Sequence, residues 1–189
     1  MGTMHINQIT LLMGLLFACS SLFTDCIAQA NHSFVGVEVC VMCHKTEKQG
    51  KQLEIWKNSK HSQAYHTLKS EEANKIAGEM NLPSPAVESE ECLRCHASGY
   101  DNKIEIIGKK FKVEDGVQCE TCHGAGSDYK DLKIMKNREE AVKKGLFLPD
   151  SKEEFCKDCH NSESPTFKGF DFEQAWMSIQ HYIPKEQQK

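Results

Sequence analysis

The distribution of hydrophobic and polar positions predicts short helices along most of the chain. Residues 46–70 are rich in Lys, Glu and Gln, with apolar residues at intervals, a pattern typical of an exposed helix. Near the C-terminus, the segment 171–183 places four apolar residues on one helical face: Phe172, Trp176, Ile179 and Ile183. We therefore expect a mainly α-helical protein.

Short polar signals predict where the later helices begin. Ser70 followed by two glutamates predicts a helix start, and Pro83 and Pro85 predict a linker after that helix. Three pairs have capping-box spacing: Asn137 with Glu140, Ser151 with Glu154, and Asp171 with Gln174. The first of these helices should stop at Gly145. The second should carry residues 156–160, and the third should carry His181 near its end.

One stretch differs from this helical pattern. Residues 103–113 alternate apolar and polar positions around Gly108, which predicts a small β-hairpin. The predicted fold class is thus mainly α with one short β-hairpin, in a single domain.

The apolar run at residues 9–19 predicts export. It is too short to cross a bilayer, which takes about 20 residues as a helix. Ala28-Gln29-Ala30 follows as an A-x-A cleavage site, although no Lys or Arg precedes the run. We therefore predict a signal peptide at 1–30, a mature domain at 31–189 and a periplasmic location.

A second interpretation of the leader uses Cys19. Leu16-Phe17-Ala18-Cys19 loosely resembles a lipoprotein box, in which an acylated cysteine would tether the protein to a membrane. Phe17 fits that pattern poorly, so simple cleavage after Ala30 is favoured. Cleavage there also removes Cys26.

The charge balance does not suggest a nucleic-acid partner, and we expect none. The chain has 23 basic and 27 acidic residues, and loss of 1–30 removes one acid, Asp25, to leave 23 and 26. The Lys-rich segment 130–144 is typical of a solvated helix face. A docking patch for an acidic redox partner is the alternative.

The strongest signal is C-x-x-C-H, which occurs four times. The motifs are Cys40-Val-Met-Cys43-His44, Cys92-Leu-Arg-Cys95-His96, Cys119-Glu-Thr-Cys122-His123 and Cys156-Lys-Asp-Cys159-His160. This spacing is the attachment signature of c-type haem, with two thiols for the porphyrin vinyl groups and a histidine for the iron. Zinc ribbons and redox dithiols also use C-x-x-C but need no following histidine. We therefore predict four haem c groups.

The size of the mature domain predicts how those haems are arranged. Removing 30 of the 189 residues leaves 159 to enclose four porphyrins. So short a chain cannot also build a large side-chain core. The haems should therefore stack closely, and the chain should depend on them to fold.

Candidates for the second axial ligands are few. Outside the motifs the mature chain has four histidines: His32, His61, His66 and His181. We favour His61 and His181 over the other two. Met135 is the other candidate, and a methionine ligand raises the haem potential relative to histidine.

Three segments resemble a known family. They are Trp56-Lys-Asn-Ser-Lys-His61-Ser-Gln-Ala-Tyr, Gly116-Val-Gln-Cys-Glu-Thr-Cys-His-Gly-Ala-Gly, and Phe170-Asp-Phe leading to His181-Tyr. With the four motifs in matching order, the chain resembles the tetrahaem cytochrome c family that includes the electron acceptor of hydroxylamine oxidoreductase.

The resemblance implies specific ligand roles. It implies that His61 is distal to the third haem, that His181 is distal to the fourth, and that the second haem is five-coordinate. The family takes the first haem's distal histidine from the segment after the third motif. Here Lys133 stands near that place and Met135 two residues on, with no histidine between His123 and His160. Met135, Lys133, another histidine or an open site are the alternatives.

Two functions fit these features. The favoured one is an electron carrier that exchanges electrons with donor and acceptor proteins the sequence does not name, alone or within a larger redox complex. The alternative is an enzyme or binder that holds nitric oxide, nitrite or hydroxylamine at a five-coordinate haem. No nucleophile–base pair or nucleotide loop accompanies the motifs, which favours the carrier. The sequence gives no oligomeric state.

Overall fold

The computed structural model describes residues 32–100 and 108–181, which belong to a compact unit spanning Asn31–Lys189. The predicted signal peptide, its cleavage site and Cys19 lie outside the described residues, as do positions 103–107 of the predicted hairpin.

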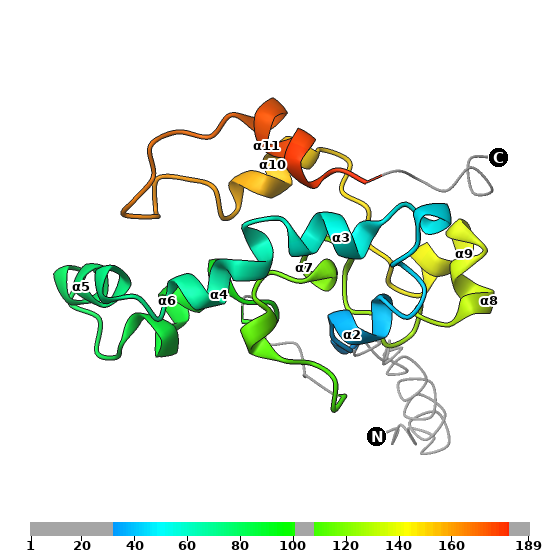
Figure 1. The fold of residues 1–189 in the computed structure, drawn as a ribbon, viewed down its shortest axis with the longest axis horizontal. Helices are drawn as coiled ribbons and strands as arrows, with labels where there is room; N and C mark the ends of the chain where they lie inside the picture. The colour runs from blue at the N-terminus through cyan, green and yellow to red at the C-terminus, as the bar shows by residue number, and fades with distance from the viewer. Residues whose placement is uncertain (1–31, 101–107, 182–189) are drawn as a thin grey trace, which may run out of the picture. The chain divides into compact units, whose positions relative to one another are not determined.

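Short helices joined by irregular segments make up the described fold, as Figure 1 shows. The α-helices are α2 (Val37–Cys40), α3 (Gln52–Lys57), α4 (Ala64–Thr67), α5 (Glu71–Glu79), α6 (Glu90–His96), α7 (Cys119–His123), α8 (Leu132–Met135), α9 (Arg138–Lys143), α10 (Lys152–Lys157) and α11 (Phe172–Ile179). The 3₁₀ helices are η1 (Glu47–Gln49), η2 (His61–Gln63), η3 (Ala86–Glu88) and η4 (Val113–Asp115).

The mainly α-helical prediction is confirmed. Residues 32–100 and 108–181 contain no strand, and the described part of the predicted hairpin consists of a turn and irregular chain at 108–112, followed by Val113 at the start of η4. Within the same residues, no helix is both long enough and apolar enough to cross a membrane.

The predicted helix starts are confirmed by side-chain caps. Ser70 Oγ accepts a hydrogen bond from Ala73 N at 3.1 Å at the start of α5. Asn137, Ser151 and Asp171 cap α9, α10 and α11 in the same way. Each cap satisfies an amide that the helix leaves unpaired and contributes about 1 kcal/mol.

The single helix predicted over 46–70 is wrong. The segment instead forms η1, α3, η2 and α4, with a break after Lys57. At the break, Ser59 Oγ donates to Trp56 O at 2.7 Å and Ser62 Oγ donates to Lys57 O at 3.0 Å. These hydroxyls offer the carbonyls an alternative to helical bonds, which is why serine is unfavourable inside helices.

Two helices also end earlier than predicted. α10 stops at Lys157, before Cys159 and His160, because Asn161 Nδ2 donates to the carbonyls of Lys157 and Asp158 at 2.8 and 3.0 Å. α11 stops at Ile179, where Gln180 adopts an extended ψ of 144°. His181 therefore follows the helix.

The hydrophobic core is small. Buried apolar residues such as Phe34, Val35 and Val37 lie apart from a cluster of five, Leu68, Ala77, Ala86, Leu93 and Ala97, which lies where α4, α5 and α6 meet. Three of the five are alanines, which bury little apolar area. Side-chain packing alone therefore stabilises this chain only modestly.

Candidate functional site

Each of the four motifs folds as one helical turn. Motif 2 forms the C-terminal part of α6, and motif 3 forms the whole of α7. Motifs 1 and 4 begin within the last two residues of α2 and α10 and continue beyond them. In motifs 1 and 4 the histidine amide donates to the carbonyl of the first cysteine, His44 N to Cys40 O at 3.1 Å and His160 N to Cys156 O at 2.9 Å. This turn places both cysteines and the histidine on one face, because positions i, i+3 and i+4 are neighbours.

Two motif histidines have a second histidine ring beside them. The ring centroids of His61 and His160 are 6.0 Å apart, and those of His123 and His181 are 5.7 Å apart. His61 thus lies at the fourth motif and His181 at the third. This is the reverse of the assignment that the family resemblance implied.

The two distances suit an iron atom between the rings. A metal–imidazole bond is about 2 Å long, so two imidazoles on opposite sides of one metal ion place their centroids about 6 Å apart. Both pairs match this spacing. The side chains at motifs 3 and 4 therefore fit a haem iron held from two sides.

His123 is the most deeply buried of these rings. Burial, and secondarily the neighbouring His181, lowers the pKa of His123 to about 4. Its Nδ1 is buried without a hydrogen-bond partner among the described residues. Phe147 N donates to its backbone carbonyl at 2.8 Å and fixes the main chain there. The ring is thus held uncharged, the form that binds a metal.

His44 and His96 have no second histidine ring in contact with them among the residues described. His96 Nδ1 instead donates to Ala64 O at 2.9 Å. That bond fixes the ring orientation and leaves Nε2 for a metal, an arrangement typical of metal-bound histidine.

Contacts between motifs give them a spatial order. The Cys40 and Cys119 thiols lie next to each other, and their interaction raises the pKa of Cys40 and lowers the pKa of Cys119. Burial, with a contribution from Cys156, raises the pKa of Cys122 to about 11. Motif 3 therefore adjoins both motif 1 and motif 4.

Motif 2 adjoins motif 4. Burial, with a contribution from the nearby His96, lowers the pKa of His160. Arg94, inside motif 2, forms an ion pair with Glu163, which follows motif 4. The motifs are therefore neighbours in the order 1, 3, 4, 2. In the haem-loaded protein these thiols become thioethers, so the contacts locate the porphyrin attachment points.

A buried carboxylate holds the segment before motif 1 against motif 3. Glu120, between the cysteines of motif 3, is 1% exposed. Its side chain accepts hydrogen bonds from Val35 N at 2.9 Å, Gly36 N at 2.8 Å and Gly126 N at 2.7 Å. Burial still raises its pKa, despite these three donors. Sequence reasoning missed Glu120, because the two positions between the cysteines accept any residue.

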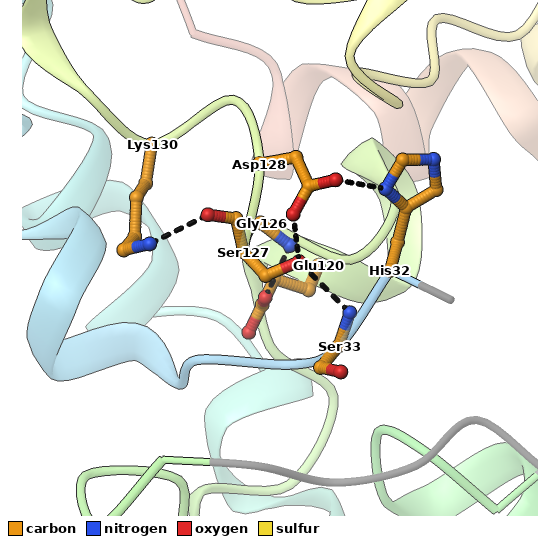
Figure 2. Close-up of polar contacts among 7 residues, drawn as sticks. All are labelled: His32, Ser33, Glu120, Gly126, Ser127, Asp128 and Lys130. Carbon is orange, nitrogen blue, oxygen red and sulfur yellow. Dashed lines mark hydrogen bonds and ion pairs between the residues drawn. The ribbon is translucent and has the colours of Figure 1, made fainter. Parts of the chain in front are cut away.

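The hydrogen bonds from Val35, Gly36 and Gly126 to the Glu120 carboxylate are called the Glu120 anchor below. Further polar contacts lie beside the Glu120 anchor, as Figure 2 shows. Ser33 N donates to Ser127 Oγ at 3.0 Å, and His32 Nδ1 lies 3.2 Å from Asp128 Oδ2. His32 is thus engaged by a carboxylate. The other minor histidine candidate, His66, is exposed, with its ring 6.0 Å from that of Tyr65.

The last two candidates for the first haem lie on α8. Met135 is the half-buried final residue of that helix, and Lys133 is exposed. Their roles at the first haem stay predictions.

Comparison with known proteins supports the haem interpretation. The family described as cytochrome c554 and c-prime matches residues 39–124, which contain the first three motifs. Cytochrome c-554 of Nitrosomonas europaea is 29% identical over 178 residues, covering 83% of this chain and 73% of that protein. The solved structure of reduced cytochrome c554 from the same organism has a TM-score of 0.52 and 27% identity, covering 75% of this chain and 72% of that one.

With four haem-attachment motifs in a mainly helical fold of this likeness, the chain is similar to the cytochrome c554 family of c-type cytochromes, and its cofactor is haem c.

Proposed function

We propose that this c-type cytochrome is a periplasmic electron carrier with four covalently bound haems that form one continuous conductor. The observation that carries the proposal is the neighbour order of the motifs, 1, 3, 4, 2, together with the two histidine pairs at motifs 3 and 4. The haem supplies the one-electron chemistry, and the chain sets spacing, ligands and local charge.

The chain holds each haem with its own motif. The cysteine pairs Cys40 and Cys43, Cys92 and Cys95, Cys119 and Cys122, and Cys156 and Cys159 provide the thioether links. His44, His96, His123 and His160 are the proximal ligands. These roles follow from the C-x-x-C-H spacing and from the single helical turn that each motif adopts.

His61 and His181 supply the second ligands of the fourth and third haems. The ring distances of 6.0 and 5.7 Å support these two roles. Met135 is the proposed second ligand of the first haem, on the ground that the histidine expected after motif 3 is absent. The stacking of the haems follows from the contacts between neighbouring motifs.

Location and tethering follow from the leader. The apolar run at 9–19 and the A-x-A site support export and cleavage after Ala30, with acylation of Cys19 as the alternative. Haem c is attached outside the cytoplasm in bacteria, which agrees with a periplasmic site. The partners are redox proteins on either side of the haem chain.

A second function concerns the haem of motif 2. No histidine ring contacts His96 among the described residues, and its Nδ1 is committed to Ala64 O at 2.9 Å. The opposite side of that haem would then be open to a small nitrogen compound such as nitric oxide, nitrite or hydroxylamine. No acid–base group has been placed over it, so binding is better supported than reduction.

Low-temperature electron paramagnetic resonance on the holoprotein separates these functions. In the oxidised protein we expect a high-spin signal equivalent to one haem per chain, and after reduction we expect that haem to bind added nitric oxide. Four low-spin haems that ignore nitric oxide would exclude the small-ligand function and leave the carrier. Haem content below four per chain would contradict the carrier as proposed.

A further inference from the structure

The α8–α9 surface, defined as residues 130–147, carries a net positive charge, as does the segment 45–69. Residues 130–144 contain six basic and three acidic residues, a net charge of +3 within a chain of net charge −4. Lys136, Lys143 and Lys144 are all exposed. Within the described part of the chain, none of these three forms a salt bridge with a carboxylate. The charges of Lys136 and Lys143 are therefore available to a partner, whereas Lys144 lies near enough to Asp128 to contribute to the lowered pKa of that carboxyl.

Apolar side chains are exposed on the same surface. Leu132 is 59% exposed, Val142 47% and Phe147 45%. Large apolar groups among exposed lysines resemble the mixture found in protein interfaces, where an apolar centre is surrounded by a polar rim. Exposed lysines are expected on a solvated helix face, but three large exposed apolar side chains are not.

The α8–α9 surface is directly continuous with motif 3. Phe147 N donates to His123 O at 2.8 Å, and Gly124 and Gly145 are packed so closely that a Cβ on Gly124 would lie 2.6 Å from Gly145 O. A surface that binds anionic lipids does not have to lie beside a haem. A surface that binds an electron donor or acceptor does, because the electron must pass between the partner and the haem. The position beside a haem motif thus favours a redox partner.

Another part of the chain has the opposite charge. Residues 71–91, which form α5, η3 and the start of α6, contain six glutamates and one lysine, a net charge of −5. An acidic partner is repelled there and attracted to the α8–α9 surface. The two regions together orient the encounter, because complementary potentials steer association.

We propose that the α8–α9 surface is the docking site of an acidic one-electron redox protein, which exchanges electrons with the haems next to motif 3. This inference rests on the proposed carrier function and adds the surface and the partner's charge. In the reducing direction, the partner loses one electron and one ferric haem gains it to become ferrous, with no bond formed or broken.

The test uses the haem-loaded protein and a reduced flavodoxin, an acidic flavoprotein, as the electron donor. Stopped-flow spectroscopy follows haem reduction at low and high ionic strength. The variant Lys136→Glu/Lys143→Glu/Lys144→Glu should slow the second-order rate about tenfold or more at low salt, because steering contributes 10- to 1,000-fold. It should also abolish the fall in rate that added salt causes in the wild type.

The matched control reverses three exposed charges in the acidic region, Glu72→Lys/Glu79→Lys/Glu88→Lys. This variant should react with flavodoxin as fast as the wild type or faster. A small neutral reductant, a free flavin semiquinone, should reduce all three proteins at equal rates. Equal rates with flavodoxin for wild type and the lysine variant would overturn the docking proposal while leaving the carrier function standing.

Other outcomes are equally decisive. Failure of wild type to accept electrons from the neutral reductant would contradict the carrier function itself. Altered reduction potentials in the lysine variant, with an unchanged salt dependence, would mean that the lysines serve the haem propionates. Binding to phosphatidylglycerol vesicles, lost in the lysine variant while its flavodoxin rate is unchanged, would assign the surface to a membrane. Both results overturn the redox-protein proposal.

Discussion

Motifs 3 and 4 differ from motifs 1 and 2 in what faces the proximal histidine. His123 and His160 each have a second histidine ring within 6.0 Å. His44 and His96 have no such ring among the described residues. The same five-residue motif is thus placed in two environments among the described residues, one with a second histidine ring in contact with the proximal histidine and one without such a contact. His181 still lies near enough to His44 to contribute, after burial, to the lowered pKa of His44.

The comparison suggests that the haems at motifs 3 and 4 have a different role from the haems at motifs 1 and 2. An iron held by two histidines stays low-spin and changes little between oxidation states, which suits electron transfer. An iron with a weak or absent second ligand can bind a molecule or take a different potential. Since the neighbour order is 1, 3, 4, 2, the two histidine-paired sites lie in the middle and the two others at the ends.

Removing both second histidines should erase this difference. We expect His61→Ala/His181→Ala to convert two haems from low to high spin, and each single variant to convert one. Magnetic circular dichroism of the oxidised holoprotein measures the change. His66→Ala, an exposed histidine close to His61 in sequence, is the matched control and should leave the spectrum as in wild type.

The pairing itself can be tested separately. In His61→Ala, the open iron should belong to the haem of Cys156 and Cys159, because the ring of His61 lies beside His160. A crystal structure of the haem-loaded variant would show which haem has lost a ligand. A vacant position at the haem of Cys119 and Cys122 would refute the pairing.

Met135→Ala tests one of the unpaired motifs with a smaller change. If Met135 ligates the first haem, the variant should lose the thioether–iron charge-transfer band and lower the potential of that haem, since a methionine ligand raises it. Near-infrared absorption and potentiometry report both effects. A band that is already missing from wild type, or that survives in the variant, removes Met135 from the ligand set.

Glu120→Gln should leave the haem spectra unchanged and weaken the hydrogen bonds that hold the segment before motif 1 against motif 3. An amide side chain keeps one acceptor oxygen but turns an NH₂ group toward backbone donors. We therefore expect the free energy of unfolding to fall by about 2 kcal/mol, the usual worth of a hydrogen bond to a charged group. Chemical denaturation measures it, with the exposed Glu153→Gln as a control that should change little.

The raised pKa of Glu120 also predicts the direction in which the free energy of unfolding changes with pH. Burial raises the pKa of Glu120 above its ordinary value. A carboxyl whose pKa rises on folding loses stabilisation as the pH increases from the unfolded pKa through the folded one. The wild type should show this slope and Glu120→Gln should not. An identical slope in both proteins would mean that Glu120 ionises as it does in the unfolded chain.

Features encoded within a few residues could be predicted from the sequence. Ser70, Asn137, Ser151 and Asp171 were identified as caps because the capping bond joins positions three apart. The helical turn of each C-x-x-C-H is equally local. The break after Lys57 was missed because serine hydroxyls at 59 and 62 decide it, against a favourable composition.

Features that depend on distant segments could not be predicted. Which iron His61 faces depends on where α10 and the residues after it are placed, and no spacing rule specifies that. The family resemblance implied that His61 and His181 are second ligands of the third and fourth haems, whereas the ring contacts place His61 beside His160 and His181 beside His123. Glu120 was missed for a related reason, because its donors at positions 35 and 36 lie far from it in sequence.

The sequence separation of that anchor constrains the timing of assembly. Val35 and Glu120 are 85 residues apart, and the bonds from Val35 and Gly36 form only once the chain as far as motif 3 is available. Contacts of such long range form slowly, because the intervening loop must close first. Until then the segment before motif 1 lacks its buried partner. We therefore expect that motif 1 can receive its haem before the hydrogen bonds to Glu120 fix the preceding segment against motif 3.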